Sequence, residues 1–389
     1  MPRLGPVTTS VSTTVLAVLP VYLVGGLAGP LRDDMPLSAT ALGVAVGAFF
    51  AMSAVASPVF GRYTEQRDPW TVIRGSVLVA VVALLGIAAL TQSWVHLAGW
   101  LMVAGVANSL VQPVTNSVVA HHVDRARHGI VLGAKQAAIP AASLLAGLGV
   151  TLLAHPLGWR SLFALAGGIG VLMFFLLPTA GGVRRPSAGT RDAPRRLTGL
   201  MRTAVAAAFG ASAANSVPVF ITGTAIAEGV EGSTAGLLLS LGSAAAIAAR
   251  LVMGRVADTA RVDRFRLLSL VMVLGAVGLG VLALIPSLGS SLSTAGLVVG
   301  TVLAFGAGWG WQGLLHLAVV TRYPSAPSRA TGVVISGVYV GGIAGPILLG
   351  VLIDHVGYTG AWAAGAVNLL VAATVTWPGR TSRLPSAAD

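Results

Sequence analysis

The segment GGVRRPSAGTRDAPRRLTGLMR, residues 181–202, decides how the rest of the chain is divided. It combines proline, glycine and serine with six arginines, a composition that is typical of a polar linker. Long apolar runs dominate the sequence on both sides of it. The polar residues 179–202 therefore predict a linker between an N-terminal bundle at 1–178 and a C-terminal bundle with a short tail at 203–389.

The composition indicates that lipid is the solvent of this chain. Apolar residues make up 55% of its 389 residues and the mean hydropathy is +0.85. Charged residues make up 9%, compared with about 25% in an ordinary soluble domain. The absence of cysteine excludes disulfides and thiolate metal sites. The formal charge of +12 is spread through short loops, so it favours orientation in a membrane over nucleic-acid binding.

Twelve apolar runs approach or exceed the roughly 20 residues that a helix needs to cross a bilayer. They lie at 8–29, 39–60, 72–91, 95–119, 130–154, 159–178, 203–226, 233–254, 266–286, 293–320, 331–353 and 359–377. We therefore predict an all-α polytopic membrane protein with twelve transmembrane helices in two six-helix bundles. Because six passages return the chain to the same side, the two bundles have the same orientation, with a pseudo-two-fold axis along the membrane normal.

The arginines predict the orientation in the membrane. With the N-terminus inside, only Arg32 and Arg160 of the 23 arginines fall on the outer side, in agreement with the positive-inside rule. The outer loops instead hold Asp33, Asp34, Glu228, Glu231 and Asp354. We expect a multi-pass protein of the bacterial plasma membrane with both termini in the cytoplasm.

The two halves repeat each other at one end of the helices. A shift of 193 residues aligns Gly61-Arg62 with Gly254-Arg255 and places Glu65 against Asp258. An acidic residue among arginines or at a helix N-terminus could latch a closed state, so we predict that these six residues form a gate. A solvated cluster that only sets the orientation is the alternative.

The sequence resembles the major facilitator superfamily. The loops GRYTEQRDPW and GRVADTARVDR resemble the family's motif after its second helix. The segments GWRSLF and GYTGAW resemble the family's pattern at the outer ends of the fifth and eleventh helices. The resemblance implies secondary transport by alternating access, with the first, fourth, seventh and tenth helices lining a cavity. It also implies that the second helix meets the eleventh, and the fifth meets the eighth, across the interface between the halves.

Small residues recur every four positions on the second and eleventh predicted helices. They are Gly43, Gly47 and Ala51 on the second and Gly337, Gly341 and Gly345 on the eleventh. Such stripes allow helix backbones to approach closely in lipid. The resemblance implies that both stripes lie at the interface where the two halves move against each other. Static helix packing is the alternative.

Polar residues inside the apolar runs mark candidate substrate-binding positions, because they are costly in lipid. Asn108, Gln112 and Asn116 share one face of the fourth predicted helix, Trp309, Gln312 and His316 share one face of the tenth, and Asn215 lies on the seventh. The amides would bind a solute and Trp309 would form an apolar wall, although bonds between helices are the alternative. His316 could also carry a proton, or could be a packing residue.

Lys135, the only lysine, lies in the fifth predicted helix next to Gln136. Its ammonium could snorkel to the headgroups. Alternatively, Lys135 and Arg250 face each other across the fifth and eighth helices and hold an anion, because two such cations otherwise repel. The run from Gly133 to Pro140 resembles a subgroup of the family associated with cyanate and nitroimidazole transport. The Arg250–Gly254 spacing resembles monocarboxylate and oxalate carriers.

These patterns predict a secondary carrier of a small organic anion, working by uptake or exchange. We expect a monomer that needs neither cofactor nor metal, with protons as the candidate coupling ion. The alternative is a drug or multidrug efflux carrier, although the absence of a mid-span carboxylate counts against it. A membrane enzyme would need a nucleophile–base or metal constellation, which the sequence lacks. A sensor would need an added soluble domain, and ATP-driven pumping would need a P-loop.

Overall fold

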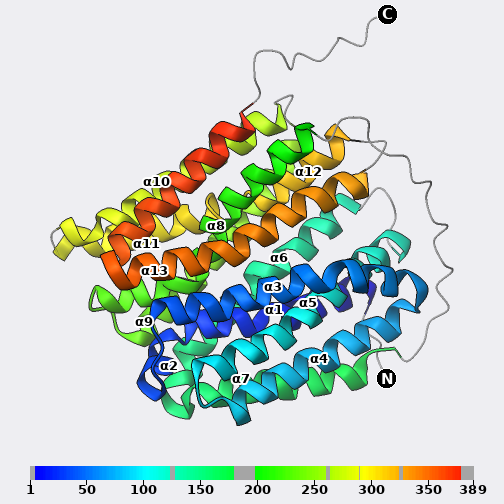
Figure 1. Ribbon diagram of the computed structural model, residues 1–389, viewed down its shortest axis with the longest axis horizontal. Coiled ribbons are helices and arrows are strands. Elements are labelled where there is room, and N and C mark those ends of the chain that lie inside the picture. Colours follow the sequence, from blue (N-terminus) through cyan, green and yellow to red (C-terminus); the bar gives the residue numbers. More distant parts are fainter. Residues whose placement is uncertain are drawn as a thin grey trace, which may run out of the picture.

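The computed structural model describes residues 5–122, 128–178, 198–259, 263–288, 290–323 and 327–377. These residues form helices and no strand (Figure 1). The helices are α1 Pro6–Gly26, α2 Ala28–Asp34, α3 Ala39–Gln66, α4 Pro69–Leu90, α5 Trp94–His122, α6 His128–Gly149, α7 His155–Leu176, α8 Thr198–Ala227, α9 Gly232–Thr259, α10 Arg264–Leu284, α11 Ser290–Gly306, α12 Gln312–Arg322 and α13 Pro327–Thr376. A π-helical turn, Val150–Ala154, joins α6 to α7.

Twelve passages follow from these helices, which confirms the predicted fold class. Ten of the described helices are long and apolar enough to cross a membrane. One of them, α13, is kinked at Gly357, where a φ of 76° suits glycine and interrupts the helix. The kink divides α13 into two passages, drawn in orange and red in Figure 1. The remaining passage is made by α11 and α12 together.

Short polar residues start several of the helices. The side chains of Ser38, Asp68 and Asp263 accept hydrogen bonds from backbone N–H groups in the first turns of α3, α4 and α10. These bonds satisfy donors that the first turn of a helix leaves unpaired. Local sequence therefore sets where these helices begin.

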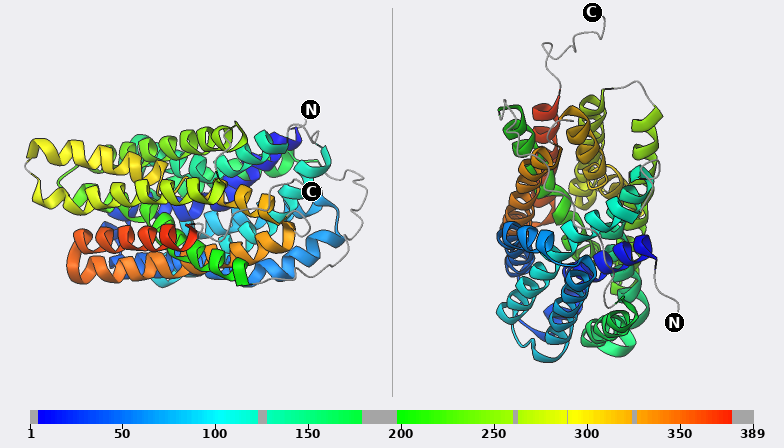
Figure 2. Two further views of the ribbon diagram at one scale, coloured as in Figure 1. Left: turned by 90° about the horizontal axis from the view of Figure 1, so that it is seen from above. Right: turned by 90° about the vertical axis from the view of Figure 1, so that its right-hand side faces the viewer.

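Helices α1–α7 pack against one another, as do α8–α13, and the two groups lie side by side (Figure 2). Between the groups, α3 lies against α13, α6 against α9, and α1 against α8. The first two of these pairs are those that the family resemblance implies. Residues 179–197, most of the predicted linker, lie outside the described residues, and α8 begins at Thr198 rather than at the predicted residue 203.

The tenth predicted helix, 293–320, is broken, which corrects the sequence prediction. Residues 307–311 form turns between α11 and α12. Glycine permits the break, because a Cβ on Gly308 would lie 2.4 Å from the carbonyl oxygen of Ala304 and a Cβ on Gly310 would lie 2.1 Å from that of Gly306. Hydropathy does not distinguish an apolar helix from an apolar turn, so the run resembled one helix. The short helix α2 was also not predicted.

The two small-residue stripes do not face each other: the α3 stripe lies at the interface between the halves, as predicted, whereas the prediction is wrong for the α13 stripe. A Cβ on Gly47 of α3 would lie 2.9 Å from the side chain of Ile347 in α13. The α13 stripe instead faces α8, because a Cβ on Gly345 would lie 2.2 Å from the carbonyl oxygen of Ser212. Positions two residues apart in a helix point about 200° apart. Helix α13 therefore turns one face to α3 and the glycine face to α8.

Candidate functional site

Lys135 is buried in α6 and donates hydrogen bonds to α5. Its side chain is only 1% exposed. Its Nζ atom lies 3.0 Å from both the backbone oxygen and Oε1 of Gln112, and 2.6 Å from Oδ1 of Asn116. Because an ammonium has three donors, these oxygens satisfy it fully. The snorkelling alternative is therefore wrong: the charged group turns toward a neighbouring helix.

A chain of hydrogen bonds continues from Lys135 into α3. Nε2 of Gln112 donates to Oδ1 of Asn108 over 3.3 Å, and Nδ2 of Asn108 donates to Oγ of Ser53 over 3.1 Å. Because an ammonium only donates, Lys135 sets the direction of these bonds and the orientation of both amides. The structure thus brings the α5 amides together with Lys135. Ser53 was not predicted, since a lone hydroxyl in an apolar run carries little signal.

Arg250 of α9 lies beside the break between α11 and α12, and its side chain is 8% exposed. One terminal nitrogen donates to the backbone carbonyl of Gln136 in α6. The other donates to the carbonyl of Trp309 over 3.3 Å and to Oε1 of Gln312 over 3.5 Å. The guanidinium carbon also lies 5.4 Å from the centroid of the Trp309 ring, a cation–π contact. Three other predicted site residues, Gln136, Trp309 and Gln312, therefore contact the guanidinium of Arg250.

Several of these residues bury N–H groups that have no hydrogen-bond partner in the described part of the protein. The atoms are Nε of Arg250, Nε1 of Trp309, Nε2 of Gln312 and Nδ2 of Asn215. Each of them is a donor, and leaving a buried donor unpaired costs about 1–3 kcal/mol. This part of the molecule therefore suits a ligand that offers hydrogen-bond acceptors.

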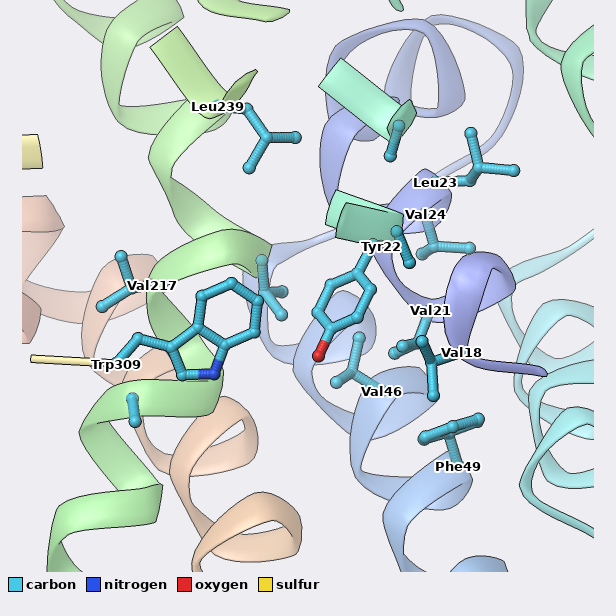
Figure 3. Packing of buried hydrophobic residues seen from close by; sticks show 14 of the residues in the cluster. Val18, Val21, Tyr22, Leu23, Val24, Val46, Phe49, Val217, Leu239 and Trp309 are labelled. Carbon is cyan, nitrogen blue, oxygen red and sulfur yellow. The ribbon is translucent and has the colours of Figure 1, made fainter. Parts of the chain in front are cut away.

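An aromatic contact joins the two halves beside Arg250. Tyr22 of α1 lies edge-on to Trp309, with ring centroids 5.5 Å apart, and Phe305 packs on the same tryptophan at 5.7 Å. Figure 3 shows Tyr22 and Trp309 side by side, near Val217. Tyr22 was not predicted, although it is the only aromatic residue in the apolar run 8–29. The apolar wall predicted from Trp309 is thus built from both halves.

The remaining predicted site residues, His316 and Asn215, lie on α12 and α8. His316 of α12 places Nδ1 2.7 Å from the backbone oxygen of Gln312. Asn215 of α8 lies two turns before Thr222, which donates to the carbonyl of Gly25 in α1 over 2.8 Å. Asn215 and Thr222 therefore share the face of α8 that is turned toward α1, and no described bond links Asn215 to Arg250.

The predicted gate residues lie at one end of the bundle, which we call the Gly254 end. A Cβ placed on Gly254 would meet no atom of the described residues within 4 Å. The side chain of Arg255 is exposed. The side chains of Arg62, Glu65 and Asp258 lie outside the described residues, so the latch stays a prediction.

Hydrogen bonds join the two halves at the opposite end, which we call the Asp354 end. The carboxylate of Asp354, in α13, accepts the backbone N–H of Ala39 over 2.9 Å and that of Thr40 over 2.8 Å, at the start of α3. Thr151 donates to the carbonyl of Ser233 over 2.9 Å, which joins the π-helical turn to α9. The helix dipole of α3 favours a negative charge at this position. The Asp354 end is therefore held together by direct bonds between the halves.

Replacing Asp354 with asparagine is expected to loosen the Asp354 end. Asparagine removes the charge and one acceptor, and caps of this kind contribute about 0.5–2 kcal/mol. Because the chain has no cysteine, a pair of spin labels on cysteines at positions 33 and 231 can report the separation of the halves. We expect a larger share of long distances in D354N. Glu228→Gln at the same end is the control, and an unchanged distance distribution in D354N would show that Asp354 does not hold the halves together there.

Comparison with known proteins places the sequence among transporters. The family model described as Major Facilitator Superfamily matches residues 10–326 and 204–388. An MFS-type efflux pump of Mycolicibacterium smegmatis is 29% identical over 254 residues, 61% of this chain and 58% of the pump, so the chain spans less than two thirds of that relative. Monocarboxylate transporter 11 of Homo sapiens is 27% identical over 354 residues, 86% of this chain and 74% of that protein.

Solved structures share the fold at low sequence identity. A bacterial homologue of the human lysosomal transporter Spinster, in an inward-facing and occupied conformation, has a TM-score of 0.71 and 17% identity and covers 95% of both chains. The D-xylose–proton symporter has a TM-score of 0.74 and 14% identity, covering 95% of this chain and 96% of the symporter. These likenesses concern the arrangement of helices alone.

Proposed function

Because this chain belongs to the Major Facilitator Superfamily, we propose that it carries a small organic anion across the membrane by alternating access. The protein is a multi-pass membrane transporter. The site built around Arg250, Trp309 and Gln312, with Lys135 behind it, is the proposed substrate site. We propose that the protein takes up this anion or exchanges it for another solute.

The observation that carries this proposal is buried positive charge that has no counterion among the described residues. Lys135 and Arg250 are both almost fully buried. Their described partners are amide oxygens, backbone carbonyls and an aromatic ring, all of them neutral. Buried charges are costly unless they are paired. An anionic substrate would supply the missing negative charge.

The hydrogen bonds favour different roles for the two cations. The three donors of Lys135 are already used by α5, whereas Nε of Arg250 and the nearby side-chain nitrogens of Gln312 and Trp309 have no partner among the described residues. We assign the direct contact with the anion to Arg250 and these two neighbours, and a longer-range electrostatic role to Lys135. The rings of Tyr22 and Trp309 would lie against the apolar part of the substrate.

The two ends of the bundle support alternating access. Asp354 and the π-helical turn join the halves at one end, whereas at the other end a Cβ placed on Gly254 would meet no atom of the described residues within 4 Å. We propose that the Gly254 end faces the cytoplasm of a bacterial cell, since the arginine-rich loops lie there. The halves that rock against each other would be residues 1–178 and 203–389, joined by the cytoplasmic linker 179–202.

Efflux of an apolar, drug-like compound is the second candidate. The relative from Mycolicibacterium smegmatis is an efflux pump, and the contact of Tyr22, Trp309 and Phe305 offers an aromatic surface. The same surface lies beside Arg250, which repels a cationic drug. An uncharged apolar substrate remains compatible with the aromatic residues, so the two candidates differ in the charge of the solute.

The proposed function is tested with two carboxylates, benzoate and lactate, and with benzylammonium, which is close to benzoate in size and opposite in charge. Purified protein is assayed for binding of benzoate, lactate and benzylammonium, and proteoliposomes for their flux with and without a proton uncoupler. We expect the carboxylates to bind and to be transported, and benzylammonium to do neither. Transport of an uncharged aromatic solute such as benzyl alcohol, with no response to either carboxylate, would overturn the anion proposal and support efflux.

Replacing Lys135 with methionine is expected to weaken carboxylate binding about tenfold. A buried charge that acts through space contributes roughly 1 kcal/mol or more to the binding of an anion at an effective dielectric constant near 20. The variant also leaves oxygens of Gln112 and Asn116 without their donor, so its thermal unfolding is measured alongside. Unchanged carboxylate affinity in a folded K135M protein would remove Lys135 from the site.

A further inference from the structure

Two arginines lie beside Trp377 at the Gly254 end of the C-terminal half. Arg202 of α8 donates from Nε to the carbonyl of Val375 over 2.7 Å, and from a terminal nitrogen to that of Trp377 over 3.2 Å. The guanidinium carbon of Arg266 in α10 lies 5.4 Å from the centroid of the Trp377 ring. Helix α13 packs against both α8 and α10 (Figure 1). The ends of three helices therefore form one group, Arg202, Arg266 and Trp377, which we call the Trp377 cluster.

The positive charge of the Trp377 cluster is available to an anion from outside the protein. Both arginine side chains are exposed, and no described carboxylate is within ion-pair distance of either. The nearest acidic residue in sequence, Asp263, accepts hydrogen bonds from the backbone N–H groups of Phe265 and Arg266 and so caps α10. One terminal nitrogen of Arg202 and the whole guanidinium of Arg266 make no described hydrogen bond. The cluster therefore has donors to offer.

The N-terminal half shows that one arginine is enough to cap the corresponding helix end. Arg74 of α4 donates to the carbonyl of Leu177, just after α7, over 3.1 Å, and its guanidinium carbon lies 4.3 Å from the centroid of the Phe174 ring. Arg74 is partly buried. A positive charge is favourable at the C-terminal end of a helix, and Arg202 supplies it for α13. Arg266 is therefore additional to what helix capping requires.

Exposed apolar side chains lie one turn along the helix from each arginine of the cluster. Val205 follows Arg202 by three residues and Leu270 follows Arg266 by four, so each pair shares a helix face. Val205, Leu270 and Trp377 are all exposed. Tryptophan is enriched where the hydrocarbon of a membrane meets water. The cluster therefore lies where lipid headgroups meet acyl chains, and a soluble anion would leave the apolar side chains uncovered.

We propose that the Trp377 cluster binds the phosphate of an anionic membrane lipid, whose acyl chains lie along Val205 and Leu270. Guanidinium groups bind phosphate oxygens through paired, charge-assisted hydrogen bonds. Arg202 is held in place by its two bonds to α13, so little side-chain freedom is lost when it binds. This site lies at the surface of the C-terminal half and is separate from the buried residues around Arg250. The inference does not depend on which solute the protein carries.

The test is a lipid titration of the purified, detergent-solubilised protein, followed by native mass spectrometry. The probes are dioleoyl phosphatidylglycerol and dioleoyl phosphatidylcholine, which share their acyl chains and differ in net charge. Wild-type protein is expected to bind its first phosphatidylglycerol about tenfold more tightly than phosphatidylcholine. R266M and R202M should each weaken phosphatidylglycerol binding about fivefold and leave phosphatidylcholine binding unchanged.

The matched control is Arg322, an exposed arginine at the end of α12 and at the same end of the bundle. R322M removes the same charge and should bind phosphatidylglycerol like wild type. Because Arg202 also caps α13, the unfolding temperature of R202M is measured alongside. R266M loses no described hydrogen bond, so it tests the site even if R202M does not fold.

Three results would overturn the inference. The first is equal affinity of the wild-type protein for the two lipids. The second is a phosphatidylglycerol affinity that R266M leaves unchanged or that R322M lowers equally, because either would indicate a general effect of charge. The third is binding of glycerol 3-phosphate that is as tight as that of phosphatidylglycerol and equally sensitive to R266M, which would identify a soluble phosphate as the ligand.

Discussion

Replacing Arg250 with methionine is expected to weaken carboxylate binding about 100-fold or more. The substitution removes a buried, partly unpaired guanidinium that we place against the substrate, and losing a buried charged contact of this kind costs about 3 kcal/mol. The unfolding temperature should change little, because replacing a buried charge with an apolar side chain is often neutral or stabilising. Binding of benzoate and lactate, measured together with the unfolding temperature, separates the two effects.

Two further substitutions sharpen this prediction. R250K keeps the positive charge and loses the planar fork, so it should recover only part of the affinity. Arg266 of α10 lies 5.4 Å from the ring of Trp377, the same distance that separates Arg250 from Trp309, but its side chain is exposed. R266M is therefore the matched control and should bind like wild type. Near-normal carboxylate affinity in R250M would place the anion elsewhere.

Replacing Gly43 with alanine is expected to shift the protein away from the state closed at the Asp354 end. The added Cβ would lie 2.0 Å from the carbonyl oxygen of Pro346, so α3 and α13 must separate. Overpacking of this kind costs about 1–3 kcal/mol, which corresponds to roughly a 5- to 150-fold change in a conformational equilibrium. Spin labels on cysteines at positions 33 and 231 should report longer distances, and transport should slow.

Two other glycine-to-alanine substitutions test whether the effect is specific to the interface between the halves. Gly75→Ala on α4 adds a Cβ that meets no atom within 4 Å and should leave the distances unchanged. Gly341→Ala adds a Cβ 2.2 Å from the carbonyl oxygen of Ala208, a contact between α13 and α8 inside the C-terminal half. It should lower the unfolding temperature without changing the distance between the halves. Equal distance changes in G43A and G341A would contradict an interface role for Gly43.

The candidate site was only partly accessible to sequence reasoning. The polar residues that interrupt apolar runs, such as Gln112, Lys135 and Arg250, stand out because lipid excludes such side chains. Their partners do not stand out. Tyr22 and Ser53 are ordinary residues in apolar helices, and only their contacts with Trp309 and Asn108 bring them into the site. The bond from Asp354 to α3 joins residues more than 300 positions apart.

The sequence by itself determined the number of membrane passages and the residues that lipid would not tolerate, because both depend on local composition. It did not determine the break at 307–311, since an apolar turn and an apolar helix have the same hydropathy. It also did not determine that the glycines of α13 face α8, or that Lys135 turns toward α5. Those features depend on how each helix is rotated about its axis, and only packing against neighbouring helices sets that rotation.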